Sequence, residues 1–477
     1  MSPCLTGKME VESRLQECLD RREREGTLRS LMPLPTSSSS SPNLSSLLSP
    51  STSPIIDFSS NDYLGFARCP EQHHRVESAY NQCMSTTSSH DQGPLLGATG
   101  SRLLSGDSNL ARSLEANLAH IHNRPAALLF NSGYDANLSV LSSLPYRDDV
   151  EDAIIMDELV HNSLVMGVRM GRLKKENVYT FQHNDVDDLR RVLDNVMKSS
   201  ATTPTVLIVI ESVYSMDGDV APMKDILDLA EHTGAAVIVD EAHGLGIFGR
   251  TNANDMVLEP SLPENGEAER KQQRSQGGTG ALAALNLEHH PALLCSVHTF
   301  GKAAGCHGAV VAGSNTIISY LVNYARPFVY STALPPHSLV SIQQSYESML
   351  SEEGERRRKV VFHFVRVFRH EMERGLSSFG RGCPFELLPS PSPIQAVLVP
   401  GNESCKSICK DLREIDRFDV YPIRSPTVSK GKERIRIILH AHNKEDEVRA
   451  LVKALIASFR RSMIYSNSMK SYSISKL

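Results

Sequence analysis

The stretch AAVIVDEAHGLG, residues 235–246, places an apolar, β-branched run directly before an acidic residue, Asp240, and a group of small residues. A run of this length is typical of a buried β-strand. Similar runs recur along the chain with amphipathic helical segments between them, which indicates a mostly parallel sheet covered by helices. We therefore predict an α/β fold with strands at Ala126–Phe130, Ala153–Met156, Pro204–Ile210, Ala235–Asp240, Leu293–Val297 and Ala309–Ala312.

The rest of the 477-residue chain is organised around this sheet. A charged helical pattern at 11–29 precedes a Ser-rich segment, 36–54, whose composition cannot bury enough apolar surface to fold and predicts flexibility. After Pro335-Pro336 the pattern changes to long helices, two strands (Ile394–Val399 and Arg434–Leu439) and a final amphipathic helix, which indicates a smaller α+β domain. The predicted divisions are an N-terminal arm and Ser-rich segment (1–54), a large domain (55–335) with a polar, exposed insertion (251–279), a small C-terminal domain (336–465) and a flexible tail (466–477).

Composition excludes several classes of function. The chain has 50 Lys and Arg against 55 Asp and Glu, a formal net charge of −5, whereas nucleic-acid-binding proteins usually carry a basic excess. No apolar run approaches the ~18–20 residues of a membrane span. The nine cysteines include no Cys-x-x-Cys pair, so we expect reduced thiols and no metal site. We expect a soluble, intracellular protein that binds neither nucleic acid nor a membrane.

Asp240 and the residues after it have three interpretations. As the acidic motif of a helicase, Asp240 would require a phosphate-binding Gly-x-x-x-x-Gly-Lys-Ser/Thr loop elsewhere, and none of the Gly-Lys pairs of the chain continues in that way. The glycines at 244, 246 and 249 match a dinucleotide fingerprint, but they follow the strand too late and lead into a polar loop. A third possibility is that Asp240 pairs with the pyridinium nitrogen of pyridoxal phosphate.

That third interpretation requires a lysine that binds the cofactor covalently, and Lys302 is a candidate. It follows a predicted strand in the stretch SVHTFGKAAG, residues 296–305, where the glycines permit close approach and Thr299 is placed to bond a phosphate. The stretch Ser132-Gly133-Tyr134 opens a helix, where backbone N–H groups bind phosphates, and His161 follows a strand at the same edge as Asp240. Taken singly, each has an ordinary alternative: a surface lysine, a Ser-Gly helix start and a loop histidine.

Six stretches in order carry a resemblance to a known family. Together they resemble the α-oxoamine synthases, a branch of the fold-type-I pyridoxal-phosphate (PLP) enzymes, over most of residues 55–455. The stretches are DFSSNDYLG (57–65), GATGSR (97–102), ESVYSMDGD (211–219), DEAHGLG (240–246), TFGKAAG (299–305) and YSTALPP (330–336).

The resemblance implies a role for each matching residue. Lys302 is implied to bind PLP covalently, Asp240 to pair with the ring nitrogen, His161 to stack on the ring, and His243 and Ser215 to bond near its phenolic oxygen. Glu211 is counted with the cofactor-binding residues. The phosphate is implied to contact Ser132, Gly133, Tyr134 and Thr299, together with Thr332 from a neighbouring subunit, which implies a homodimer with shared sites. Asn61 and Arg436 are implied to contact the substrate, with Arg436 holding its carboxylate.

The implied reaction is a decarboxylative condensation of an amino acid with an acyl-CoA. The resemblance is greatest to the branch that joins L-alanine to pimeloyl-CoA and gives 8-amino-7-oxononanoate, an intermediate of biotin biosynthesis. Two alternatives stay open: a sibling enzyme that uses glycine or serine with another acyl-CoA, and a non-catalytic subunit that pairs with an active partner. The family's N-terminal substrate-contacting arginine has no clear match here, so the acyl chain is left open.

The last three residues, Ser475-Lys476-Leu477, match the address that a peroxisomal import receptor reads. From them we expect a peroxisomal enzyme.

Overall fold

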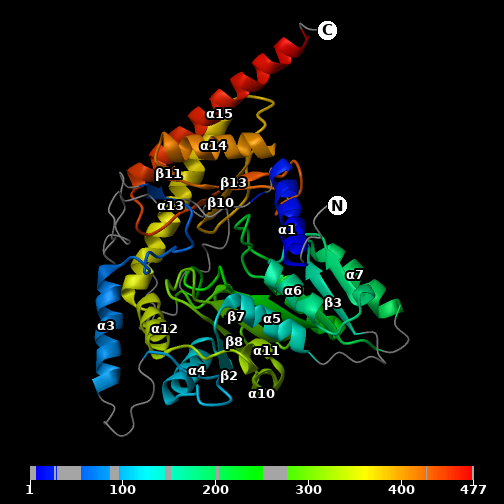
Figure 1. Ribbon diagram of the computed structural model, residues 1–477, viewed down its shortest axis with the longest axis vertical. Helices are drawn as coiled ribbons and strands as arrows, with labels where there is room; N and C mark the ends of the chain where they lie inside the picture. The colour runs from blue at the N-terminus through cyan, green and yellow to red at the C-terminus, as the bar shows by residue number, and fades with distance from the viewer. Residues whose placement is uncertain are drawn as a thin grey trace, which may run out of the picture.

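The computed structural model describes residues 7–25, 28, 55–85, 96–144, 152–199, 203–250, 277–425 and 427–474. Its large domain is built on a seven-stranded sheet in the order β2-β8-β7-β6-β5-β3-β4 (Figure 1), in which β8 alone runs antiparallel to its neighbours. The mostly parallel sheet predicted from the apolar runs is therefore confirmed. The strands are β2 (Ala126–Phe130), β3 (Ala153–Asp157), β4 (Val178–Phe181), β5 (Val206–Glu211), β6 (Ala236–Asp240), β7 (Leu293–Thr299) and β8 (Ala309–Gly313).

Helices on both faces bury this sheet, which explains why its central strands are apolar throughout rather than alternating. Several of them begin at a serine that caps the helix: Ser108, Ser132 and Ser314 each accept a backbone N–H from the first turn. The helices are α3 (Pro70–Ser85), α4 (Asn109–Ile121), α5 (Gly133–Ser143), α6 (Asn162–Met170), α7 (Val186–Ser199), α8 (Met223–Thr233), α9 (Ala281–Ala284), α10 (Asn315–Tyr324), α11 (Arg326–Val329) and α12 (Pro336–Met349), with a 3-10 turn at Lys175–Asn177.

The small domain has its own core. An antiparallel sheet in the order β12-β13-β10-β9 packs against long helices, and a short parallel pair joins β1 to β11. Its elements are β1 (Ile56–Asp57), β9 (Glu386–Leu387), β10 (Ile394–Leu398), β11 (Phe418–Asp419), β12 (Tyr421–Ile423), β13 (Arg434–Ile438), α13 (Glu352–Ser377), α14 (Asn402–Glu414) and α15 (Glu445–Ile474).

The two cores divide the chain differently from the predicted boundaries. Phe58, at the start of the predicted large domain, packs in the small-domain core, because β1 pairs with a strand about 360 residues later. Conversely, Leu339, Ile342 and Tyr346 of α12 belong to the core of the large domain.

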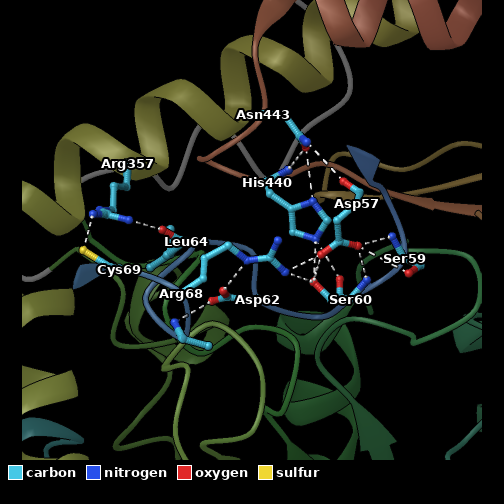
Figure 2. Close-up of polar contacts among 11 residues, drawn as sticks. Asp57, Ser59, Ser60, Asp62, Leu64, Arg68, Cys69, Arg357, His440 and Asn443 are labelled. Atoms are coloured by element: carbon cyan, nitrogen blue, oxygen red, sulfur yellow. Dashed lines mark hydrogen bonds and ion pairs between the residues drawn. The ribbon is translucent and has the colours of Figure 1, made fainter. Parts of the chain in front are cut away.

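The chain crosses from the small to the large domain immediately after β1, and a polar network holds this crossing in place (Figure 2). Asp57 accepts the backbone N–H groups of Ser59 and Ser60 at 2.9 and 3.0 Å, and its own carbonyl accepts Asn443 Nδ2 at 3.1 Å. His440, which follows β13, lies with Nε2 2.9 Å from the Ser60 carbonyl. The residues just beyond, 61–65, are therefore held at a defined position between the domains.

Three segments differ from expectation. The N-terminal helix α1 spans Gly7–Arg24 rather than 11–29. Residues 277–279, predicted as part of an exposed insertion, are buried, because Gly278 lies against the side chain of the buried Arg358. Helix α15 continues to Ile474 through much of the predicted flexible tail, where no Gly or Pro interrupts it. The Ser-rich segment 36–54, insertion residues 251–276 and Ser475–Leu477 lie outside the described residues. In the part of the chain that is described, no helix is both long and apolar enough to cross a membrane.

Candidate active site

A cavity of about 290 Å³ opens at the carboxyl ends of the central strands, where open α/β sheets bind their ligands. It is lined by residues from separate segments that the sheet brings to one edge. The lining residues are Ser132, Gly133, Tyr134, Asn137, His161, Ser163, Glu211, Asp240, Ala242, His243, Thr299, Gly301, Lys302, His307 and Gly308.

Asp240 is the last residue of β6 and is almost fully buried. Its Oδ2 accepts Asn137 Nδ2 at 2.7 Å, and its Oδ1 accepts the backbone N–H of Ala242 at 2.8 Å. These two donors fix the carboxylate in one orientation at the floor of the cavity. A carboxylate held in this way suits a cationic ring N–H of a ligand.

His161 caps the N-terminus of α6 at another wall of the cavity. Its Nδ1 lies 2.7 Å from Ser163 Oγ, which is also 2.9 Å from Asn137 Nδ2. Burial lowers the pKa of His161 against the opposing effect of Asp240, with the charge of Lys302 lowering it further. The imidazole is therefore kept neutral and oriented, as a ring that stacks on a planar ligand requires.

Glu211 ends β5 and accepts the backbone N–H of His161. Burial, with the nearby charge of Asp240, raises the pKa of Glu211 well above its usual value. This shift favours the neutral form of the Glu211 carboxyl.

Lys302 lies in the turn after β7, and burial is the main cause that lowers its pKa. Asp240 and Glu211 oppose this shift, while the guanidinium of Arg436 adds to it. A lysine with a lowered pKa has an amine that can act as a nucleophile and as a base near neutral pH.

One end of the cavity is suited to a phosphate. The N-terminus of α5 begins at Gly133, whose missing Cβ would lie 2.0 Å from Thr299 Oγ1. Only glycine allows this helix end and Thr299 to approach so closely, which leaves backbone N–H groups and a hydroxyl facing one spot. His307 lines the same cavity from the turn between β7 and β8.

The small domain contributes residues just outside this cavity. Arg436 on β13 donates from Nε to the Ser215 carbonyl at 2.7 Å and from Nη2 to Asn61 Oδ1 at 3.0 Å. Tyr63 connects these residues to the cavity, because its hydroxyl lies 2.6 Å from His243 Nδ1 and 3.3 Å from Asn61 Oδ1. Burial lowers the pKa of His243 well below its usual value, and Lys302 and Arg436 lower it further.

Nine of the predicted site residues therefore line one cavity, and four do not. Asn61, Ser215 and Arg436 form the adjoining cluster just described. Thr332 lies in a separate recess, where its carbonyl accepts Asn131 Nδ2 at 3.0 Å.

Four residues with polar side chains that contact the site were not predicted: Asn137, Ser163, Tyr63 and His307. Asn137 lies one helical turn after Gly133 on α5, so the helical period could have identified it. Tyr63 lies within a stretch that carried the resemblance, but its contact with His243 spans 180 residues and left no local signal.

Comparisons with known proteins agree with this geometry. Residues 53–455 match the family Aminotransferase class I and II. The chain belongs to the aminotransferase class I and II family.

The similar curated proteins include several 8-amino-7-oxononanoate synthases. The enzyme of Emericella nidulans is 33% identical, over 94% of this chain and 95% of its own. That of Saccharophagus degradans is 34% identical, over 86% of this chain and 88% of its own.

Two solved structures share the fold. Serine palmitoyltransferase from S. paucimobilis superposes with a TM-score of 0.69 at 24% identity, covering 86% of this chain and 88% of its own. The 8-amino-7-oxononanoate synthase of Francisella tularensis gives a TM-score of 0.64 at 22% identity, covering 86% of this chain and 99% of its own. The fold-type-I class predicted from the resemblance is thus confirmed.

Proposed function

We propose that this chain is a PLP-dependent acyltransferase that condenses L-alanine with pimeloyl-CoA to give 8-amino-7-oxononanoate, CoA and CO₂, a step of biotin biosynthesis. The observation that carries the proposal is the placement of Lys302 and Asp240 in one cavity, in a chain that is 33% identical along almost its whole length to an 8-amino-7-oxononanoate synthase. Lys302 and Asp240 are both present and lie in one cavity, which favours an active enzyme over a non-catalytic subunit.

The described residues fit PLP. Asp240 would hold the ring nitrogen, His161 would stack on the ring, and His243 would face the phenolic oxygen. The N-terminus of α5 and Thr299 would hold the phosphate, while Lys302 would bind the aldehyde carbon. When bound, PLP supplies an electron sink for the Cα of the amino acid, which is most effective with a protonated ring nitrogen.

The chain's own residues perform three further tasks. Arg436 binds the amino-acid carboxylate through charge-assisted hydrogen bonds and so orients its Cα. The Lys302 amine, with its lowered pKa, would take the proton from the Cα of the bound amino acid. The neutral His243, oriented by Tyr63, donates a hydrogen bond at the phenolic side of the cavity.

The test is to measure CoA release across a matrix of amino acids and acyl-CoAs. We expect the highest kcat/KM for L-alanine with pimeloyl-CoA. A preference for glycine or serine, or for another acyl chain, would assign the chain to a sibling reaction and refute the proposed substrates.

Lys302→Ala separates the enzyme from the non-catalytic alternative. This variant should lose both CoA release and the visible absorbance of the bound cofactor, whereas Lys359→Ala, an exposed lysine on α13, should keep both. A wild-type protein that shows no absorbance of bound cofactor after reconstitution and removal of excess PLP would favour the non-catalytic subunit.

We further propose that the chain acts as a homodimer with shared sites. Thr332 lines a recess together with Gly106 and Ser331. Leu104 and Tyr330, close to these two in the sequence, are 82% and 81% exposed, which supports a partner surface there. Mixing Thr332→Ala subunits with Lys302→Ala subunits should restore wild-type cofactor affinity to a share of the sites. A protein that is monomeric by light scattering would contradict the proposal.

We also propose import into peroxisomes, supported by the terminal Ser475-Lys476-Leu477. A fluorescent protein fused ahead of the chain should enter peroxisomes, and removal of the three residues should leave it in the cytosol. Unchanged localisation after the removal would refute this proposal.

A further inference from the structure

Outside the cavity, His183 lies between two carboxylates. Its Nδ1 is 2.9 Å from Asp157 Oδ1, and its Nε2 is 2.7 Å from Asp219 Oδ2. An ionised carboxylate only accepts hydrogen bonds, so both ring nitrogens must carry a proton, and the ring is an imidazolium.

The surroundings of His183 support this charge. Burial alone would lower its pKa, but the hydrogen bonds to Asp157 and Asp219, with the charges of these carboxylates, outweigh burial and raise the pKa to about 9. The polar and charged groups near the ring are Asp157 of β3, Glu158, which accepts the His183 backbone N–H, Asn184, Tyr214, Asp217 and Asp219.

These residues do not form a metal site in the described structure, although His183, Asp217 and Asp219 lie close enough together. Both nitrogens of His183 are already engaged by carboxylates, and Asp217 forms an ion pair with Arg434 on β13. The positively charged imidazolium of His183 therefore neutralises the carboxylates that a metal ion would otherwise bind.

On one side, the imidazolium holds the loop that follows β5. Asp219 accepts its hydrogen bond, and the Asp219 carbonyl accepts the Tyr214 N–H at 3.0 Å. The Tyr214 ring also packs edge-on against His183, with ring centres 4.4 Å apart. The next residue, Ser215, presents the carbonyl that accepts Arg436 Nε at 2.7 Å.

On the other side, the imidazolium holds the end of β3. Asp157 accepts the Leu159 N–H at 2.8 Å, and so shapes the turn that leads to His161 in the cavity. His183 thus joins the segment that carries His161 to the loop that orients Arg436.

We propose that the imidazolium of His183 is a positioning residue for substrate binding: by holding Asp219 it fixes the Ser215 carbonyl, and with it the guanidinium of Arg436 that receives the amino-acid carboxylate. This inference deepens the proposed function and rests on the role given there to Arg436. Loss of the proton or of the ring should weaken carboxylate binding more than it weakens cofactor binding, because His183 itself does not line the cavity.

The probe is propanoate, which has the carboxylate of L-alanine but no amine that titrates. Its binding to the PLP-loaded enzyme is followed by the change in cofactor fluorescence and needs no turnover. The result therefore does not depend on which acyl-CoA the enzyme uses, so the test remains valid even if pimeloyl-CoA is not the substrate.

We compare the wild type with His183→Gln and His290→Gln. His290 is the matched control, since it also faces carboxylates, Asp228 at 3.2 Å and Glu231 at 3.6 Å, but in a region remote from the cavity. The wild-type Kd for propanoate should stay constant from about pH 7 to about pH 8 and rise roughly tenfold by about pH 10. His183→Gln should raise the Kd about tenfold at pH 7 and make it independent of pH over this range, while its PLP affinity changes less than about threefold.

Two results would overturn the proposal. One is a His183→Gln variant whose propanoate Kd equals that of His290→Gln, which would leave His183 with a purely structural role. The other is a wild-type pH profile retained in His183→Gln. If that variant does not fold, Asp219→Asn, which removes one carboxylate but keeps the ring, must reproduce the weaker propanoate binding.

Discussion

The contact between Gly133 and Thr299 gives the sharpest single prediction for the cofactor end of the cavity. In Gly133→Ala, the new Cβ would lie 2.0 Å from Thr299 Oγ1 and 3.0 Å from its Cβ and Cγ2. Neither neighbour can move freely, because Gly133 begins α5 and Thr299 ends β7, which is paired on both sides. Overpacking of this kind costs about 1–3 kcal/mol of stability.

Gly133→Ala should also weaken cofactor binding, because the Thr299 side chain must rotate to avoid the new Cβ. If its hydroxyl rotates away from the α5 N-terminus, the phosphate loses one charge-assisted hydrogen bond, about 1.5–3 kcal/mol. PLP should then bind between about 10-fold and about 100-fold more weakly. Titration of the apoprotein with PLP, followed by absorbance, measures the affinity, and thermal unfolding of the apoprotein measures the stability.

Two further variants test whether the effects of Gly133→Ala come from its contact with Thr299. Gly97→Ala is the matched control, because its Cβ would meet nothing within 4 Å and should change neither quantity. Gly133→Ala combined with Thr299→Ala removes the two closest side-chain atoms, so it should regain part of the stability but not the affinity. A Gly133→Ala protein with wild-type unfolding temperature and PLP affinity within about twofold of wild type would refute the reasoning.

Three further predictions concern other parts of the site. Asn137→Ala removes the 2.7 Å hydrogen bond to Asp240, so it should lower the unfolding free energy by about 1.5–3 kcal/mol in urea denaturation; an unchanged value would show that Asp240 is held by other groups. Arg436→Lys should raise the KM for L-alanine at least about tenfold with little change for the acyl-CoA, because lysine lacks the bidentate fork; steady-state kinetics with both substrates checks this, and equal changes would contradict it. Burial raises the pKa of Asp62 from 3.8 to about 6, so the folded protein binds a proton that the unfolded chain releases, and stability falls as pH rises through this interval. Asp62→Asn should remove this dependence of the unfolding free energy on pH and should be more stable than the wild type above pH 6, by at most ~3 kcal/mol. Urea denaturation at several pH values measures both effects, and a pH dependence that persists in the variant would mean that another group causes it.

Local sequence pattern was enough for six of the seven strands of the central sheet and for three of the residues that line the cavity. Strand β2 has its predicted bounds, and the ends of β3, β5, β6 and β7 lie within two residues of theirs. Once these strands are taken as parallel, His161, Asp240 and Lys302 must meet, because the carboxyl ends of parallel strands share one edge. Three stretches that lie far apart in the sequence are therefore sufficient to assemble the centre of the site.

Contacts between distant segments account for what the sequence did not reveal. The pairing of Ile56 with Phe418 moves residues 55–58 into the small-domain core, and no periodicity in either segment indicates it. Strand β4 was missed because it is only four residues long, although Val, Tyr, Thr and Phe all favour strands. Residues 277–279 were predicted to be exposed because segment 251–279 is polar and has few apolar residues, whereas the close approach to Arg358 is what requires Gly278.

Residues 250 and 277, the described residues on either side of the insertion, lie next to two backbone hydrogen bonds that offer a practical opportunity. The backbone is closed there by the Gly246 N–H on the Gly278 carbonyl at 2.8 Å and by the Gly280 N–H on the Phe248 carbonyl at 2.9 Å. The entropic cost of closing an inserted segment grows only with the logarithm of its length, about 0.6 kcal/mol for each doubling. A longer insertion between these two fixed ends therefore lowers the stability of the domain only slightly. A reporter domain or affinity tag inserted between 251 and 276 would be carried at this closed point of the backbone and would leave both chain ends unmodified.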